Sequence, residues 1–101
     1  MTDTVAPVET VPIAQVRARE YAKVRGRVRS VRVRPWGDNP TLEIVLTDDT
    51  GGLTVVFLAR RQIAGIRPGT VMSVEGMVGA AHQRLVILNP RYELESVPGI
   101  H

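Results

Sequence analysis

The stretch over residues 21–34 constrains the fold more than any other part of this sequence. Small or apolar residues at the even positions 22 to 28 alternate with basic residues at the odd positions 23 to 29. Strict alternation of this kind is typical of a half-buried β-strand. The parity then reverses, because Val31 and Val33 are apolar at odd positions. We therefore predict one long strand with a β-bulge at Arg29 and Ser30, which absorbs one residue and bends the strand.

The same strand would carry most of the positive charge on its outward face. Eight of the thirteen cations lie between Arg17 and Arg34, against the single acid Glu20, so the modest net charge of +3 hides a local basic stripe. A long bent strand with Gly26 in its middle suits a small barrel, in which one strand serves two sheets. The predicted stripe comprises Lys23, Arg25, Arg27, Arg29, Arg32 and Arg34.

Length and composition place the chain among small globular proteins. A chain of 101 residues corresponds to one domain, and a hydrophobic fraction of 44% favours a folded core over disorder. The absence of cysteine excludes disulfides and thiolate metal sites. No apolar run approaches the roughly 20 residues that span a bilayer, and the first residues do not resemble a signal peptide. We expect a cytoplasmic protein that does not enter a membrane.

Four further strands follow the long one, separated by turn signals. We predict them at residues 41–47, 53–58, 71–78 and 84–89, with turns at 35–40 and 48–52 and a flexible loop at 79–83. Residues 59–66 could form a short helix, which Gly65 weakens and Pro68 stops. This order predicts an all-β fold, the five-stranded Greek-key OB-fold barrel with a short helix between strands three and four. We place a flexible arm at 1–12, the OB-fold domain at 13–95 and a C-terminal tail at 96–101.

A spacing of glycines and valines supports this assignment. It runs through Val24-x-Gly26-x-Val28, Leu46-x-Asp48-Asp49-Thr50-Gly51 and Pro68-Gly69 followed by Val74-x-Gly76-x-Val78. The pattern resembles the OB-fold nucleic-acid-binding superfamily over residues 13–95. Within it, the chain resembles the wedge OB domain of the branch-migration helicase RecG, whose last strand leads into a stretch similar to residues 89–93, and is also similar to small stand-alone OB-fold proteins of actinobacteria. Because these 101 residues hold no motor domain, the resemblance implies binding and not unwinding.

The candidate binding residues follow from the surface that OB domains use. These domains bind oligonucleotides on the outer face around strands two and three, flanked by the loops between strands one and two and strands four and five. Outward arginines would border that face and suit forked contacts with phosphate, although the same residues could simply form a solvated face. Trp36 would stack on a base or fold over the barrel mouth. The predicted nucleic-acid-binding residues are Arg25, Arg27, Arg29, Arg32, Arg34, Trp36, His82 and Arg84.

The sequence gives no support for catalysis. Asp48 and Asp49 form a carboxylate pair, but before Thr50 and Gly51 they are better interpreted as turn residues. No nucleophile–base arrangement and no phosphate-binding glycine loop is visible, and none of the serines lies on a nucleophile elbow. We expect no enzyme activity, no metal site and no cofactor.

The sequence is compatible with two functions of different classes and, less directly, with a third. The first is a non-catalytic module that binds single-stranded or junction DNA or RNA through the basic strand and the loop at 35–40. The alternative is a protein-interaction adaptor or self-associating module, because Val45, Val56 and Leu58 would form an apolar patch on the outer face of strands two and three. The third is a peripheral subunit of an enzyme whose catalytic residues lie elsewhere.

Overall fold

The computed structural model describes residues 8–95 of the chain. The first seven residues of the predicted arm and the whole predicted tail lie outside this range. One short 3-10 helix precedes six strands: η1 (Ile13–Gln15), β1 (Tyr21–Trp36), β2 (Asn39–Thr47), β3 (Gly52–Leu58), β4 (Val71–Ala81), β5 (Arg84–Leu88) and β6 (Arg91–Leu94).

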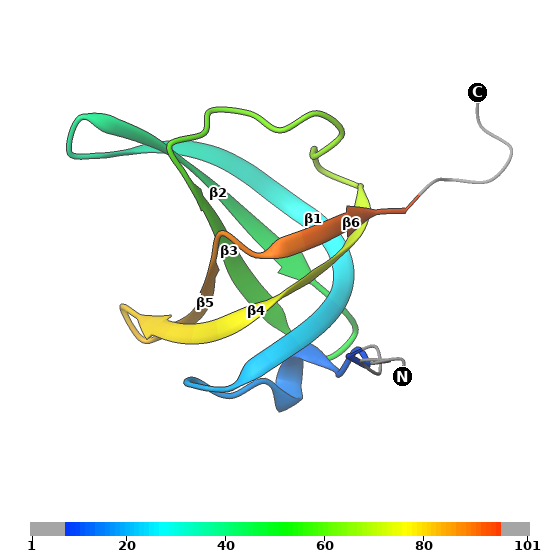
Figure 1. The fold of residues 1–101 in the computed structure, drawn as a ribbon. Helices are drawn as coiled ribbons and strands as arrows, with labels where there is room; N and C mark the ends of the chain where they lie inside the picture. The colour runs from blue at the N-terminus through cyan, green and yellow to red at the C-terminus, as the bar shows by residue number, and fades with distance from the viewer. Residues whose placement is uncertain (1–7, 96–101) are drawn as a thin grey trace, which may run out of the picture.

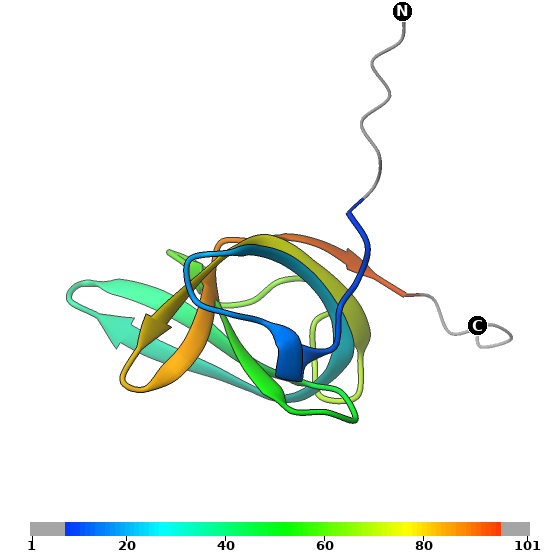
Figure 2. The ribbon, with the colours of Figure 1, turned by 90° about the horizontal axis from the view of Figure 1, so that it is seen from below.

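Five of these strands close into a ring (Figures 1 and 2). Strand β1 pairs antiparallel with β2 and with β4, β2 pairs antiparallel with β3, β3 pairs parallel with β5, and β5 pairs antiparallel with β4. Strand β6 follows β5 and continues along β4. This ring confirms the predicted five-stranded OB-fold barrel.

Strand β1 closes the ring because it changes partner along its length. Its first part pairs with β4 and its second part with β2, and Arg27 pairs with both Val71 and Thr47. The register between β1 and β2 shifts between Val28 and Ser30, which confirms the predicted bulge. A Cβ atom on Gly26 would lie 2.6 Å from the carbonyl oxygen of Thr47, so only glycine fits where the strands cross.

The interior of the barrel is filled by the aliphatic side chains that alternate inward on each strand. Fully buried examples are Val24, Val28, Leu42, Ile44, Leu46, Leu53, Val55, Met72, Val74, Val78 and Ile87. In Figure 1, η1 lies at the lower end of the barrel and the β3–β4 connection at the upper end. Both contribute buried residues to the core: Ile13 from η1, and Ile63 and Ile66 from the connection.

Asp48 fastens η1 to the barrel. Its carboxylate accepts hydrogen bonds from the Ile13 amide (2.9 Å), the Thr50 amide (2.7 Å) and hydroxyl (2.6 Å), and the Gly51 amide (3.0 Å). Burial opposes ionisation here, but the hydrogen bonds outweigh it, so the pKa of Asp48 lies below its ordinary value. Asp48 is thus a turn residue, as predicted, and also a link to η1.

Two predictions about connections are wrong. The β3–β4 connection, all of which the structure describes, contains no helix: Ile66 donates to the Ile63 carbonyl in a single turn, and Gly65 has a φ of 85° that a helix does not allow. The flexible loop predicted at 79–83 is instead a tight hairpin, because β4 continues to Ala81. Its two turn residues, His82 and Gln83, have φ values of 52° and 64°.

Candidate nucleic-acid interface

Two hairpins project from the same side of the barrel and enclose a groove. The β1–β2 hairpin turns at Gly37 and Asp38, the β4–β5 hairpin turns at His82 and Gln83, and β2, β3 and β5 lie between them (Figure 1). The groove has a volume of about 380 Å³ and is lined by residues of all these strands. It therefore lies on the surface that OB domains use for oligonucleotides.

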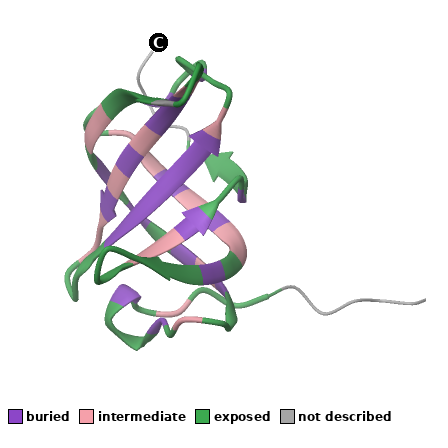
Figure 3. Cartoon of the chain, turned by 90° about the vertical axis from the view of Figure 1, so that its left-hand side faces the viewer, coloured by how far each residue is buried: buried purple, intermediate pink, exposed green. Residues whose placement is uncertain are grey.

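The floor of the groove consists of outward-facing side chains that nevertheless have little contact with solvent. Thr41, Thr54 and Val56 alternate with core residues, yet they are only 7%, 6% and 9% exposed. Figure 3 looks at this side of the barrel and shows buried strand segments between exposed hairpin tips. Because outward residues on a flat sheet would be exposed, their burial shows that the surface is hollowed.

The rims of the groove carry its charge. Arg34 rises from β1, while His82 and Arg84 lie on the opposite hairpin, and all three are exposed. The guanidinium Nε of Arg34 lies 3.3 Å from a carboxylate oxygen of Glu43, which is the one acid among the described residues that line the groove. Arg32 pairs in register with Glu43 on the same outward face. The groove therefore brings together Arg34, His82 and Arg84 of the predicted residues, with Arg32 beside them.

Arg25 and Arg27 lie on the part of β1 that pairs with β4, and their guanidinium groups are already bonded. Arg25 donates two hydrogen bonds to Glu95, one of them from Nη2 at 2.8 Å, and these lower the pKa of the Glu95 carboxyl. Arg27 donates from Nη1 to the carbonyl of Gly69 at 2.9 Å. Arg29 is the extra residue of the bulge and lies between the two groups.

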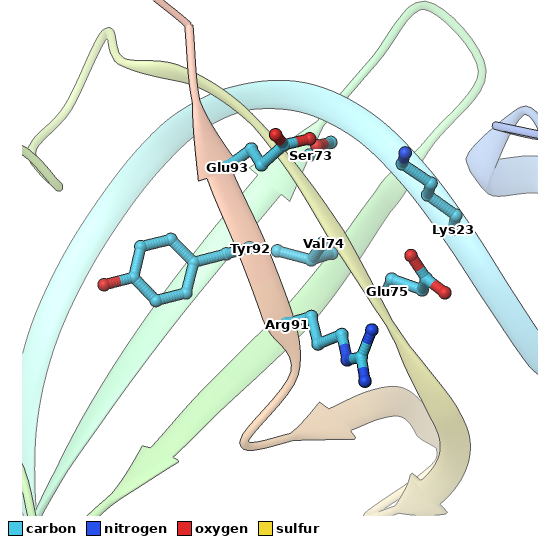
Figure 4. Close-up of a pocket in the computed structure, with 7 residues that line it drawn as sticks. All are labelled: Lys23, Ser73, Val74, Glu75, Arg91, Tyr92 and Glu93. Carbon is cyan, nitrogen blue, oxygen red and sulfur yellow. The ribbon is translucent and has the colours of Figure 1, made fainter. Parts of the chain in front are cut away.

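The surface around β4 and β6 is a shallow hollow of mixed charge. Figure 4 shows Lys23, Glu75, Arg91 and Glu93 around it, with cations and carboxylates interleaved. The hydroxyl of Tyr21 donates to Glu75 at 2.8 Å, and this hydrogen bond raises the pKa of Tyr21. Alternating charges give this surface no net attraction for a polyanion.

Trp36 ends β1 and its backbone pairs with Asn39 next to the hairpin turn. Its side chain lies outside the part of the chain that the structure describes, so its predicted stacking role stays a prediction.

The apolar patch of the alternative hypothesis lies on and beside the same groove. Val56 is on the floor, while Val45 and Leu58 are partly buried on the outer faces of β2 and β3. Strand β5 adds Val86 and Leu88, and Leu88 is 50% exposed. These two residues and Thr41 were not among the predicted binding residues. Their outward positions follow from the alternation along each strand. Their meeting in one groove depends on the parallel pairing of β3 with β5, which local sequence does not record.

Residues 8–95 contain neither a metal-binding group of side chains nor a helix that could span a membrane. No group of three or more His, Asp or Glu side chains in this range is placed to hold a metal ion. No helix in the same range is long and apolar enough to cross a membrane.

Comparison with known proteins gives a likeness in fold. No protein-family model matches the chain, and no curated protein matches it. Among solved structures, it is similar to the solution structure of a replication factor A related protein from Methanobacterium thermoautotrophicum, with a TM-score of 0.62 and 18% sequence identity over 86% of this chain and 91% of that one. At this identity the likeness extends to the fold, and the chain is an OB-fold protein whose groove lies between its two hairpins.

Proposed function

We propose that this chain is a non-catalytic module that binds single-stranded nucleic acid in the groove between its two hairpins. The observation that carries the proposal is the combination of exposed cations on both rims with a recessed, largely apolar floor. The fold is also that of a protein described as related to replication factor A.

In this proposal the rims hold the backbone and the floor receives the bases. Arg32, Arg34 and Arg84 neutralise phosphates through their guanidinium forks. Bases lie against Val56, Val86 and Leu88, and Trp36 adds a stacking contact of about 1–3 kcal/mol. Because each phosphate contact releases counterions, binding weakens steeply as salt rises.

The arginines outside the groove have a smaller part in this proposal. Arg25 and Arg27 are bonded to protein groups, so in this proposal they do not hold a phosphate. Arg29 at the bulge extends the positive edge of the groove. The resemblance to the RecG wedge domain extends the proposal to junctions, where the projecting β1–β2 hairpin would contact the point at which two strands separate.

A titration of fluorescently labelled single-stranded oligonucleotide, followed by anisotropy at low and at physiological salt, tests the proposal. We expect saturable binding that weakens with salt, together with quenching of Trp36, the only tryptophan. Absence of binding even at low salt would reject the proposal. The exposed Leu88 and the apolar floor would then favour a protein partner or self-association at the same groove.

A further inference from the structure

One hydroxyl on the floor of the groove has no hydrogen-bond partner. Thr41 Oγ1 is buried, and no described residue forms a hydrogen bond with it. Thr41 lines the groove between Arg34 on β1 and Leu58 on β3, its two partners in register. A buried polar group without a partner destabilises the folded protein, so such a group calls for an explanation.

Glu43 lies two residues further along β2 on the same face. Its side chain is 17% exposed, and Arg34 is the cation within ion-pair distance of it. A carboxylate inside a groove that binds nucleic acid repels phosphates, so phosphate binding does not explain it. It is, however, a good acceptor for the amino group of a base: carboxylates accept from the N4 amino group of cytosine.

We propose that Thr41 and Glu43 form a subsite that reads one base and prefers cytosine and adenine, whose amino group lies beside a ring-nitrogen acceptor on the Watson–Crick edge, over thymine and uracil. This inference rests on the proposed function and adds base preference to it. The carboxylate of Glu43 accepts the exocyclic amino group, and the hydroxyl of Thr41 donates to the neighbouring ring nitrogen. Thymine presents a carbonyl oxygen to the carboxylate instead, which is repulsive.

Arg34 links this subsite to the backbone. In the free protein Thr41 Oγ1 has almost no contact with solvent, and the Glu43 side chain, 17% exposed, is paired with Arg34. A phosphate that takes the guanidinium of Arg34 leaves the carboxylate without its ion pair, and because Arg34 is the register partner of Thr41 on β1, the same movement exposes the hydroxyl in this proposal. The base then replaces the partner that Glu43 loses and supplies the one that Thr41 lacks.

The test compares oligodeoxycytidine with oligothymidine of equal length, by anisotropy at low salt. These pyrimidines have the same ring size and differ in the groups at ring positions 3 and 4 and in the methyl group of thymine at position 5, which by itself would favour thymine on an apolar floor. We expect the wild-type protein to bind the cytosine strand about tenfold more tightly, within the range for a single directed base contact. Glu43→Gln should bring this ratio close to one, because an amide can accept from cytosine or donate to thymine.

Two further variants separate the subsite from general effects. Thr41→Val keeps the shape of the side chain but removes the hydroxyl, so it should reduce the ratio while raising the melting temperature of the free protein. Glu93→Gln on β6 makes the same charge change outside the groove and should keep the wild-type ratio.

Equal binding of the two oligonucleotides by the wild-type protein, or a preference that survives Glu43→Gln, would overturn the subsite while leaving salt-dependent binding in place. Absence of binding to both strands would instead reject the proposed function and the subsite together.

Discussion

The two parts of β1 carry the same kind of residue but lie in opposite environments. The part that pairs with β4 has its cations beside Glu75, Glu93 and Glu95, and the Arg25 guanidinium is hydrogen-bonded to one of them. The part that pairs with β2 has Arg32 and Arg34 at the rim of the groove. Among the described residues that line this groove, Glu43 is the one acid. A run of arginines along one strand is therefore not one binding surface.

The difference arises from closure of the barrel. Outward residues at two ends of a strongly bent strand face different directions, and each end meets the side chains of a different neighbouring strand. The change of neighbour occurs at Gly26 and Arg27, just before the bulge. Carboxylates of β4, β6 and the residue that follows β6 lie beside one group of cations, while the other group lies at the rim of the groove, where Glu43 is the carboxylate within ion-pair distance of Arg34.

The largest effect is expected from Gly26→Ala, which disturbs the crossing that separates the two parts of β1. The added methyl would lie 2.6 Å from a backbone carbonyl oxygen, so the strands must move apart. We expect a loss of about 3 kcal/mol in the free energy of unfolding, measured by urea denaturation. Gly76→Ala is the matched control, because its methyl meets the Cγ2 methyl of Ile87 at 3.1 Å, a longer contact with a side chain and not with backbone, and should cost less. Equal losses would contradict the special role of the crossing.

Two double variants, each lacking two arginines, compare the two sides of the barrel by their affinity for an oligonucleotide. Arg34→Ala with Arg84→Ala should weaken oligonucleotide binding by more than about tenfold. It should also make the negative slope of log affinity against log salt shallower by about two. Arg25→Ala with Arg27→Ala removes the same charge from the other side and should have a much smaller effect. If both double variants lose affinity equally, net charge rather than the groove determines binding.

Asp48→Asn should lower stability without altering either part of β1. An amide nitrogen cannot accept the bond from Ile13, so we expect a loss of about 1–2 kcal/mol at pH 7 by thermal or urea denaturation. Because the folded pKa of Asp48 lies below its ordinary value of 3.8, its contribution is complete above that value and is lost as pH falls through the lower folded pKa. The variant should therefore lose less stability in acid than wild type; identical acid sensitivity would be evidence against this assignment.

The smallest effect is expected from Glu95→Gln, which frees Arg25 from its ion pair. Exposed ion pairs contribute little to stability, so the melting temperature should scarcely change. Oligonucleotide affinity should also remain close to wild type, because Arg25 lies away from the groove. A marked gain in affinity would show that the β4 side also holds nucleic acid.

The sequence predicts the barrel well because strand alternation reports directly on burial. The reversal of parity near Ser30 located the bulge. The helix expected at 59–66 was wrong because Ile63 and Ile66, three residues apart, suit a single buried turn as well as a helix. Tertiary packing decides between the two, and a local pattern does not record it.

The groove between the hairpins was only partly predictable for a related reason. Alternation separates inward from outward residues, but it does not say which outward residues of a closed barrel share one side. The grouping of Arg34 with Arg84, and the enclosure of Thr41, depend on pairing between strands that are distant in sequence. The tight turn at His82 was missed because His82-Gln83 is not one of the glycine-containing pairs, such as Asn-Gly or Asp-Gly, that mark a two-residue hairpin turn.

The most direct test of the central claim is an NMR titration of the ¹⁵N-labelled protein with oligodeoxycytidine at low salt. Binding in the groove predicts that shifted amides concentrate on β2, β3 and β5 and on the tips of the two hairpins. Those on β6 and on the part of β1 that pairs with β4 should change little. Shifts centred on β4 and β6 around Lys23 and Arg25 would contradict the account, and so would a spectrum that does not change.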